Sequence, residues 1–240
     1  WIWNGQWQRA FGTAAEYIAL PSVQAAQLPD NVSFAQGGVL GIPALTAVHT
    51  VLGAGPVAGK TVLVSGGGGT VGYLAIQVAA ASGATVITTC GNDADQEAAL
   101  AAGARAALNY RSENLAADIL EASGGVLIDL AVEVEFGQNI CVLTEVIREG
   151  GRIVAYGSAK EMTPMLPFYP LMFKAVSIDL ALIYLLDDAQ RQTAVTHLTD
   201  LLERDALNLR IAETLPLKDC AKAHDMVAAG ARSGAVILEI

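Results

Sequence analysis

The sequence predicts an α/β protein that is built on a doubly wound parallel sheet. Short apolar runs alternate with helix-like periods from about residue 60 to residue 180. Four glycines, Gly66–Gly69, follow the first apolar run, and turn-rich segments flank the alternating region at both ends. Strands that alternate with helices favour parallel pairing and right-handed crossovers, so these observations indicate one large sheet covered by helices.

Six apolar segments have the length and the β-branched or aliphatic content of strands that are buried on both faces. They are Thr61–Val64, Thr85–Thr89, Ala107–Asn109, Val126–Val132, Arg152–Ala155 and Val176–Ile183. The segments between them predict helices at residues 71–79, Gln96–Ala102, Ser112–Ala122 and Gly137–Ile147. Gly83 and Gly103 stand where the first two of these helices should end.

The two ends of the chain differ from this central region. Residues 1–34 have turn residues and no helical period. Beyond residue 183 the sequence predicts, in order, a helix at Asp187–Arg204, a strand at Leu209–Ala212, a helix at Leu217–Ala229 and a strand at Ala235–Ile240. We therefore expect residues 1–34 and 184–240 to form one small domain, and residues 35–183 to form the parallel-sheet domain.

Composition excludes several classes of function. Charged residues make up 16% of the 240 residues and the net charge is −10, so no nucleic-acid partner is expected. No run of 18 apolar residues occurs, and the start does not resemble a signal peptide, so we expect no membrane span and a cytoplasmic location. Cys90, Cys141 and Cys220 fit no zinc spacing and are expected to be reduced thiols.

The glycine run carries the clearest chemical signal. Gly67, Gly69 and Gly72 form a G-x-G-x-x-G pattern after a predicted strand and at the start of a predicted helix. Glycines at these places allow a tight turn, a close approach of a pyrophosphate to the backbone, and close packing of helix on strand. The helix amides and dipole then bind the phosphates. The alternative is a glycine-rich turn that binds no ligand.

The end of the second predicted strand bears on which dinucleotide binds. A chain that binds the ribose 2′-hydroxyl of NAD usually has a carboxylate about 20 residues past the first glycine. Residues 89–92 are Thr-Cys-Gly-Asn, so a 2′-phosphate can enter, which favours NADP(H). Asp93 and Asp95 follow and weaken this preference, whereas Arg111, after the third strand, could approach the phosphate.

Six stretches in order resemble the zinc-free medium-chain dehydrogenases/reductases, and among them the quinone oxidoreductases related to zeta-crystallin. The stretches are "GTAAEYIALP", "LPDNVSFAQGGVLGIPALTAVHTV", "GKTVLVSGGGGTVG", "GARAALNYRSE", "EGGRIVAYGS" and "LPLKDCAKAHDMVAAG". The resemblance implies a Rossmann domain at 35–183 and part of a GroES-like, β-rich catalytic domain at 1–34 and 184–240, with NADPH between them.

The resemblance also implies a set of cofactor-binding residues, which divide by the part of NADPH that each would touch. They are Gly69, Thr70 and Val71 at the pyrophosphate; Gly91, Asn92 and Tyr110 at the 2′-phosphate; and Thr46, Tyr156, Gly157 and Ser158 at the nicotinamide. Relatives often have a lysine at the position of Asp95. Family members commonly dimerise through the last Rossmann strand, which implies a homodimer through Val176–Ile183.

Relatives in the resembling family have more chain before the stretch that matches Trp1, so we expect this sequence to be part of a longer protein. Without those residues Ile2, Trp3, Trp7 and Phe11 are expected to form an exposed apolar edge.

Metal-ligating and acid–base groups are sparse in the sequence. Gly41–Pro43 stand where zinc-dependent members have a ligand and cannot bind zinc, so no metal is expected. Asp129, Glu133 and Glu135 lie at the end of a strand, where they could line a cleft or simply be solvated. The three histidines are expected to be partly buried (His49), solvated (His197) and packed in a helix (His224).

No nucleophile–base pair is evident, so no catalytic residue is assigned. Hydride transfer needs none, because the cofactor supplies the chemistry and the protein orients it. The resemblance implies reduction of quinones or activated C=C bonds by NADPH. Three methionines and three aromatic residues, Met162, Met165, Phe168, Tyr169, Met172 and Phe173, could floor an apolar substrate pocket or serve core or dimer packing.

Three alternatives remain open from the sequence. The chain could bind a nucleotide without turnover, as a regulatory relative would. It could be a zinc-free enoyl-thioester reductase, although no basic cluster for a coenzyme A adenosine is evident. It could also bind RNA, which the negative charge disfavours.

Overall fold

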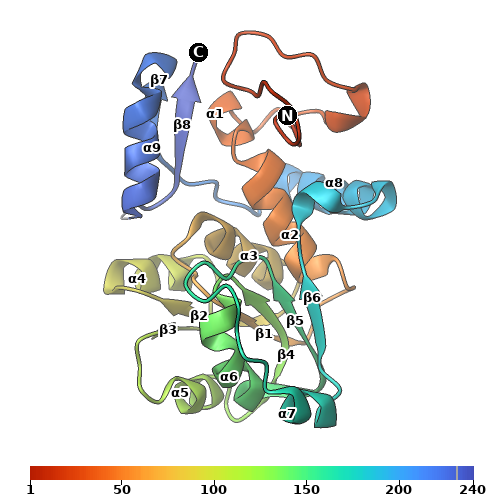
Figure 1. Cartoon of the computed structure of the whole chain (residues 1–240), viewed down its shortest axis with the longest axis vertical. Helices are drawn as coiled ribbons and strands as arrows, with labels where there is room; N and C mark the ends of the chain where they lie inside the picture. Colours follow the sequence, from red (N-terminus) through yellow and green to blue (C-terminus); the bar gives the residue numbers. More distant parts are fainter. Residues whose placement is uncertain (231) are drawn as a thin grey trace.

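The larger sheet of the protein has six parallel strands. The computed structural model describes residues 1–230 and 232–240. The strands are β1 (Thr61–Val64), β2 (Thr85–Cys90), β3 (Ala106–Asn109), β4 (Ile128–Glu133), β5 (Ile147–Ala155) and β6 (Ser177–Leu180). Their order, β3-β2-β1-β4-β5-β6, confirms the predicted α/β class (Figure 1). The order reverses beside β1, and doubly wound sheets bind ligands at the carboxyl ends of the strands next to such a reversal.

Helices cover both faces of this sheet. Side chains alternate along a strand, so Val62 and Val64 of β1 belong to one apolar cluster and Leu63 belongs to the other. The first cluster includes residues of α2 (Leu45–Leu52), α3 (Thr70–Ala81), α4 (Asp93–Ala101) and α8 (Asp188–Glu203). The second includes residues of α5 (Leu115–Ala122), α6 (Phe136–Val146) and α7 (Phe168–Phe173). The sheet is therefore the middle of three layers.

The ends of the chain lie on one side of the large sheet (Figure 1). A second, two-stranded parallel sheet consists of β7 (Ile211–Pro216) and β8 (Ala235–Glu239), and α9 (Cys220–Ala229) connects them. Before α2 come the short helix α1 (Phe34–Gly37) and a π-helix (Leu40–Ala44); 3-10 turns occupy Ser22–Gln24, Ile183–Leu185 and Leu217–Asp219. Among the described residues, no helix is long and apolar enough to cross a bilayer.

Several predicted boundaries shift in the structure. The strand predicted at 126–132 begins at Ile128, because Val126 and Leu127 lie exposed in the loop that precedes it. The strand predicted at 176–183 is only Ser177–Leu180, since the chain then leaves the sheet edge for a 3-10 turn. The strand predicted at 152–155 extends back to Ile147, a residue that the sequence places at the end of a helix.

The prediction that Ile2, Trp3, Trp7 and Phe11 form an exposed edge is wrong for Trp3, and Ile2 and Trp7 are half-buried. Trp3 is buried, with the Arg191 guanidinium 5.8 Å from its ring centroid. The Trp7 ring stacks on Tyr184, with centroids 4.5 Å apart and planes at 11°. Phe11 is 85% exposed, as expected. Residues that follow β6 in the sequence therefore cover part of the N-terminal segment, a contact that sequence spacing does not reveal.

Candidate functional site

The glycine loop joins β1 to the start of α3 and is held by backbone hydrogen bonds. The Gly67 amide donates to the Thr89 carbonyl at the end of β2 (2.9 Å), and the Gly69 amide donates to the Gly66 carbonyl (3.0 Å). A Cβ on Gly67 would lie 2.3 Å from Thr88 Oγ1, and a Cβ on Gly72 would lie 2.2 Å from the Gly66 oxygen. These two positions accept only glycine, because sheet and loop pack directly against them.

Gly69 is different, because its Cα faces open space. A Cβ there would meet, among the described atoms, only the Gly66 oxygen at 3.4 Å, an ordinary contact distance. Gly69 is also the N-cap of α3, and no side chain caps the helix there. The first amides of a helix have no partner within the helix and carry the positive end of its dipole. The loop therefore presents backbone amides that can bind an anion on the side where, among the described atoms, only the Gly66 oxygen lies close to Gly69.

A pocket of about 620 Å³ opens at this helix N-terminus. The three residues predicted at the pyrophosphate, Gly69, Thr70 and Val71, line it together with Gly72. Tyr156 lines it from the end of β5, and Pro43 lines it from the π-helix before α2. Residues far apart in the sequence thus meet where the strand order reverses, as the fold predicts. The residues that form the pocket fit a dinucleotide, since the open face of Gly69 leaves room for a pyrophosphate.

The turn after β5 is fixed to β4 and α6. The Tyr156 amide donates to the Glu133 carbonyl (2.9 Å), and the Gly157 carbonyl accepts from the Phe136 amide (3.0 Å). Ser158 Oγ accepts from the Gly137 amide at 2.9 Å and so binds a backbone amide in the first turn of α6. Burial raises the pKa of the Tyr156 phenol, and the nearby Glu133 raises it further. Tyr156 is therefore a neutral hydroxyl at neutral pH.

Thr46, predicted beside the nicotinamide, lies in α2 and has its hydroxyl bound to the π-helix that precedes α2. It is buried, and Thr46 Oγ1 donates to the Ile42 carbonyl at 2.7 Å. Pro43, one turn earlier, lines the pocket instead.

Glu133 is the site residue that sequence reasoning misses. The sequence predicts that it lines a cleft or is solvated, but its side chain is fully buried at the end of β4. Its carboxylate accepts from Ser65 Oγ (2.5 Å), the Glu135 amide (2.5 Å) and Asn139 Nδ2 (2.9 Å). Burial raises its pKa, while these hydrogen bonds lower it. Because Ser65 begins the glycine loop, Glu133 joins the loop to the N-terminus of α6.

The residues predicted at the 2′-phosphate form a second group at the ends of β2 and β3. The Tyr110 ring lies against Gly91, since a Cβ on Gly91 would be 3.1 Å from Tyr110 Cε1. Arg111 Nη1 donates to the Gly91 carbonyl at 2.5 Å. Asn92 caps α4 through the Asp95 amide, and its Nδ2 donates to Asp95 Oδ2 at 2.8 Å. A Cβ on Gly68 would lie 2.4 Å from that same Oδ2, so an anionic carboxylate sits beside the glycine loop.

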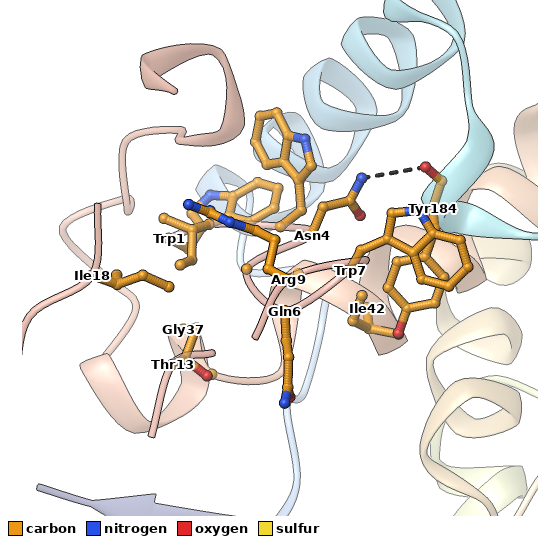
Figure 2. Close-up of a pocket in the computed structure, with 15 residues that line it drawn as sticks. Trp1, Asn4, Gln6, Trp7, Arg9, Thr13, Ile18, Gly37, Ile42 and Tyr184 are labelled. Carbon is orange, nitrogen blue, oxygen red and sulfur yellow. Dashed lines mark hydrogen bonds between the residues drawn. The ribbon is translucent and has the colours of Figure 1, made fainter. Parts of the chain in front are cut away.

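A larger cavity of about 820 Å³ lies in the N-terminal segment (Figure 2). Trp1, Trp7, Ile18, Ile42 and Tyr184 give it aromatic and aliphatic walls, as Figure 2 shows. Asn4 Nδ2 donates to the Tyr184 carbonyl (3.3 Å), which ties the segment to the turn after β6. Sequence reasoning does not predict this cavity, because its walls come from segments more than a hundred residues apart.

Several other predicted residues lie outside both groups. The six methionine and aromatic residues at 162–173 are all largely exposed and do not line the pocket at α3. His224 is exposed on α9 rather than packed, because that helix buries the face of Ala223. His49 is partly buried, as expected, and burial lowers its pKa. Within the described residues, no group of three or more His, Cys, Asp or Glu side chains is placed to hold a metal.

Comparisons with known proteins identify relatives of this chain. The sequence pattern of the zinc-binding dehydrogenase family matches residues 70–200. Quinone oxidoreductase of Sus scrofa is 31% identical over 231 residues, which cover 95% of this chain and 69% of that protein. The Homo sapiens quinone oxidoreductase is 30% identical, with the same coverage.

Solved structures agree with the sequence relatives. A quinone oxidoreductase of Pseudomonas syringae superposes with a TM-score of 0.81 at 28% identity and covers 92% of this chain and 69% of that chain. An NAD-dependent alcohol dehydrogenase gives a TM-score of 0.85 at 28% identity, over 95% of this chain and 65% of that chain. The present chain thus spans roughly two thirds of the length of the proteins it matches.

Proposed function

Since this chain belongs to the quinone oxidoreductase family of medium-chain dehydrogenases/reductases, we propose that it reduces quinones or activated C=C bonds with NADPH. The observation that carries the proposal is the pocket at the N-terminus of α3, where the open face of Gly69 meets Tyr156 and Pro43. The name that the relatives share, quinone oxidoreductase, supports the substrate class.

The chain's own residues account for how a dinucleotide is held. The amides of Thr70, Val71 and Gly72 at the start of α3 bind the pyrophosphate, and Gly69 leaves space for it. Tyr156, Gly157 and Ser158 are fixed by their backbone bonds to β4 and α6, so they form a rigid wall for the nicotinamide. Pro43 lines the same pocket.

The chemistry of the reaction is a hydride transfer that NADPH supplies when bound. The protein's part is to hold donor and acceptor in contact and to exclude water. The phenol of Tyr156, whose pKa is raised, keeps its proton at neutral pH and adds no charge to the wall. No acid–base side chain of the chain is required, because the reduced acceptor takes its proton from solvent.

Zinc independence is part of the proposal. At the position where zinc-dependent members have a ligand, this chain has Gly41, Ile42 and Pro43, none of which has a ligating side chain. The division into a Rossmann domain at 35–183 and a partial GroES-like domain at 1–34 and 184–240 is likewise proposed, and the small β7–β8 sheet supports it.

We also propose a homodimer that forms through the edge strand β6. In the sheet order β6 is the last strand, and among the described strands it pairs only with β5. Leu180, at its end, is 79% exposed. An exposed apolar edge strand is a template for pairing with a second copy.

NADPH oxidation with a panel of quinones and enones tests the proposed activity. The expected result is acceptor-dependent loss of NADPH absorbance together with saturable NADPH binding, measured by fluorescence. Binding without turnover on any acceptor would favour a nucleotide-binding relative that is not an enzyme. Turnover only on enoyl thioesters would favour an enoyl-thioester reductase.

A further inference from the structure

A lysine far from the glycine loop in sequence lies at the predicted adenosine end of the cofactor site. Lys160 follows β5, yet its Nζ is 5.6 Å from the centroid of the Tyr110 ring, at the end of β3. These strands are separated in the sheet by β2, β1 and β4. In Figure 1 the segment between β5 and α7 loops back over the carboxyl ends of the strands, consistent with this contact.

The loop that carries Lys160 is fixed at its base. The Lys160 amide donates to Glu135 Oε1 at 2.7 Å, at the start of α6. Ser158 Oγ donates to the Glu161 carbonyl and accepts from the Gly137 amide, so residues on both sides of Lys160 are anchored. The backbone is thus held in place, while the exposed lysine side chain can adjust to a ligand.

Arg111, the residue that follows Tyr110, lies at the same ring. Its guanidinium carbon is 4.5 Å from the Tyr110 centroid, and its Nη1 donates to the Gly91 carbonyl. In the described part of the chain neither Arg111 nor Lys160 forms an ion pair with a carboxylate. Two cations beside one aromatic ring, neither of them in an ion pair with a described carboxylate, match a dianionic phosphate.

Two of the acidic residues of this region lie on α4, whereas Glu135 and Glu161 lie beside Lys160. Asp93 and Asp95 are in the first turn of α4, and the Asp95 carboxylate is held by Asn92 beside Gly68. A phosphate at that helix would be repelled, whereas one at Tyr110 would be attracted. The charge pattern therefore directs a phosphate toward the ends of β3 and β5.

We infer that Lys160, together with Arg111, binds the 2′-phosphate of NADPH against the Tyr110 ring and sets the preference for NADPH over NADH. The inference rests on the proposed function, in which the adenosine ribose lies at Gly91. Lys160 is a specificity-determining residue in this arrangement. Its cation comes from the loop after β5, whereas α4 presents a carboxylate at the position where related chains often have a lysine.

Binding of NADPH, NADH and 2′,5′-ADP to the purified chain, followed by isothermal titration, tests this. Lys160→Ala is expected to weaken NADPH and 2′,5′-ADP about tenfold and to leave NADH unchanged, since only the first two have the 2′-phosphate. Lys160→Arg is expected to restore most of the binding. Lys222→Ala, which removes an exposed lysine on α9, is the matched control and should change none of the three affinities. The discrimination should also shrink at high salt, as contacts between exposed charges do.

The outcomes separate this inference from the proposed function. If the wild-type chain binds neither dinucleotide, both are overturned. If it binds dinucleotides but Lys160→Ala weakens NADPH and NADH equally, or neither, the assignment of Lys160 is overturned and the proposed function stands.

Discussion

Gly69, the N-cap of α3, and Gly72, in its first turn, stand three residues apart, and the structure predicts different consequences for the same substitution. At Gly72 a new Cβ would lie 2.2 Å from the Gly66 oxygen and 2.8 Å from the Gly66 carbonyl carbon. These are backbone atoms, so the loop itself must move. At Gly69 the new Cβ would point to the pocket and would meet, among described atoms, only an oxygen at 3.4 Å. Gly72→Ala is therefore a test of folding, and Gly69→Ala is a test of ligand binding.

The expected magnitudes follow from these distances. Inside a helix alanine is favoured over glycine by roughly 1 kcal/mol, but forcing a methyl group into a packed site costs about 1–3 kcal/mol. Because the clash is with backbone atoms, we expect the upper part of that cost, about 2–3 kcal/mol. Gly72→Ala should therefore lose about 1–2 kcal/mol net, or about 2–8 °C in Tm for a chain of this size. Gly69→Ala should cost less than about 1 kcal/mol, the usual penalty for alanine at an N-cap. Its NADPH affinity should fall at least about tenfold, which corresponds to about 1.4 kcal/mol.

Thermal unfolding and titration with NADPH measure both effects on the same samples. The reasoning is refuted if Gly69→Ala binds NADPH like the wild type, because the methyl group would then occupy no part of the ligand's space. It is also refuted if Gly72→Ala unfolds at or above the wild-type temperature. Wild-type stability in that variant would mean that the loop has room that the structure does not show.

Three further predictions concern the buried Glu133, the buried Cys90 and the proposed zinc independence. Burial raises the pKa of Glu133, so its protonation stabilises the folded protein fully below the pKa that Glu133 has in the unfolded chain, and this stabilisation is lost as pH rises through the folded-state pKa. The Tm of Glu133→Gln should therefore rise relative to that of the wild type between pH 4.5 and 8. A Tm difference that stays constant over this range would contradict the prediction. Burial raises the pKa of Cys90 to about 11, so a thiol reagent at pH 8 should modify the exposed Cys141 and Cys220 in the native protein and Cys90 only after denaturation. Dialysis against a strong chelator should leave Tm and reductase activity unchanged, whereas a loss that zinc restores would overturn the proposed zinc independence.

The central sheet could be predicted because its signals are local. Each of the six strands is a short apolar run between helical periods, and the glycine pattern marks the first βα turn. The ends of the strands were less predictable, since an apolar pair such as Val126 and Leu127 is typical of a strand although it lies exposed in a loop. The same limit applies to 181–183, where the chain leaves the sheet edge without any change in hydropathy.

The site was predictable where one continuous segment builds it and not where segments converge. Gly69 and its neighbours form such a segment, and the structure places them at one pocket. Lys160 meets Tyr110 only because a loop crosses the sheet, and Trp7 meets Tyr184 only because the chain returns after β6. A pattern within one short stretch of sequence cannot predict either contact, because the two residues of each contact lie far apart in the chain.

Glu133 lies between these two cases. Once one residue pair between β1 and β4 is known, the parallel register gives the partner of every other residue of these strands. Val62 of β1 pairs with Leu130 of β4, and Val64 pairs with Val132, so each partner is 68 residues further along. The same offset of 68 residues pairs Thr61 with Asp129 and Ser65 with Glu133. The Thr61 amide donates to Asp129 Oδ2 at 2.8 Å, and the Ser65 hydroxyl donates to Glu133. Both carboxylates thus serve β1, one where the strand begins and one where the glycine loop begins. Asp129, Glu133 and Glu135 are similar in sequence but bind different groups. The strand register places Asp129 and Glu133 beside β1, whereas Glu135 lies beyond β4 and accepts from the Lys160 amide.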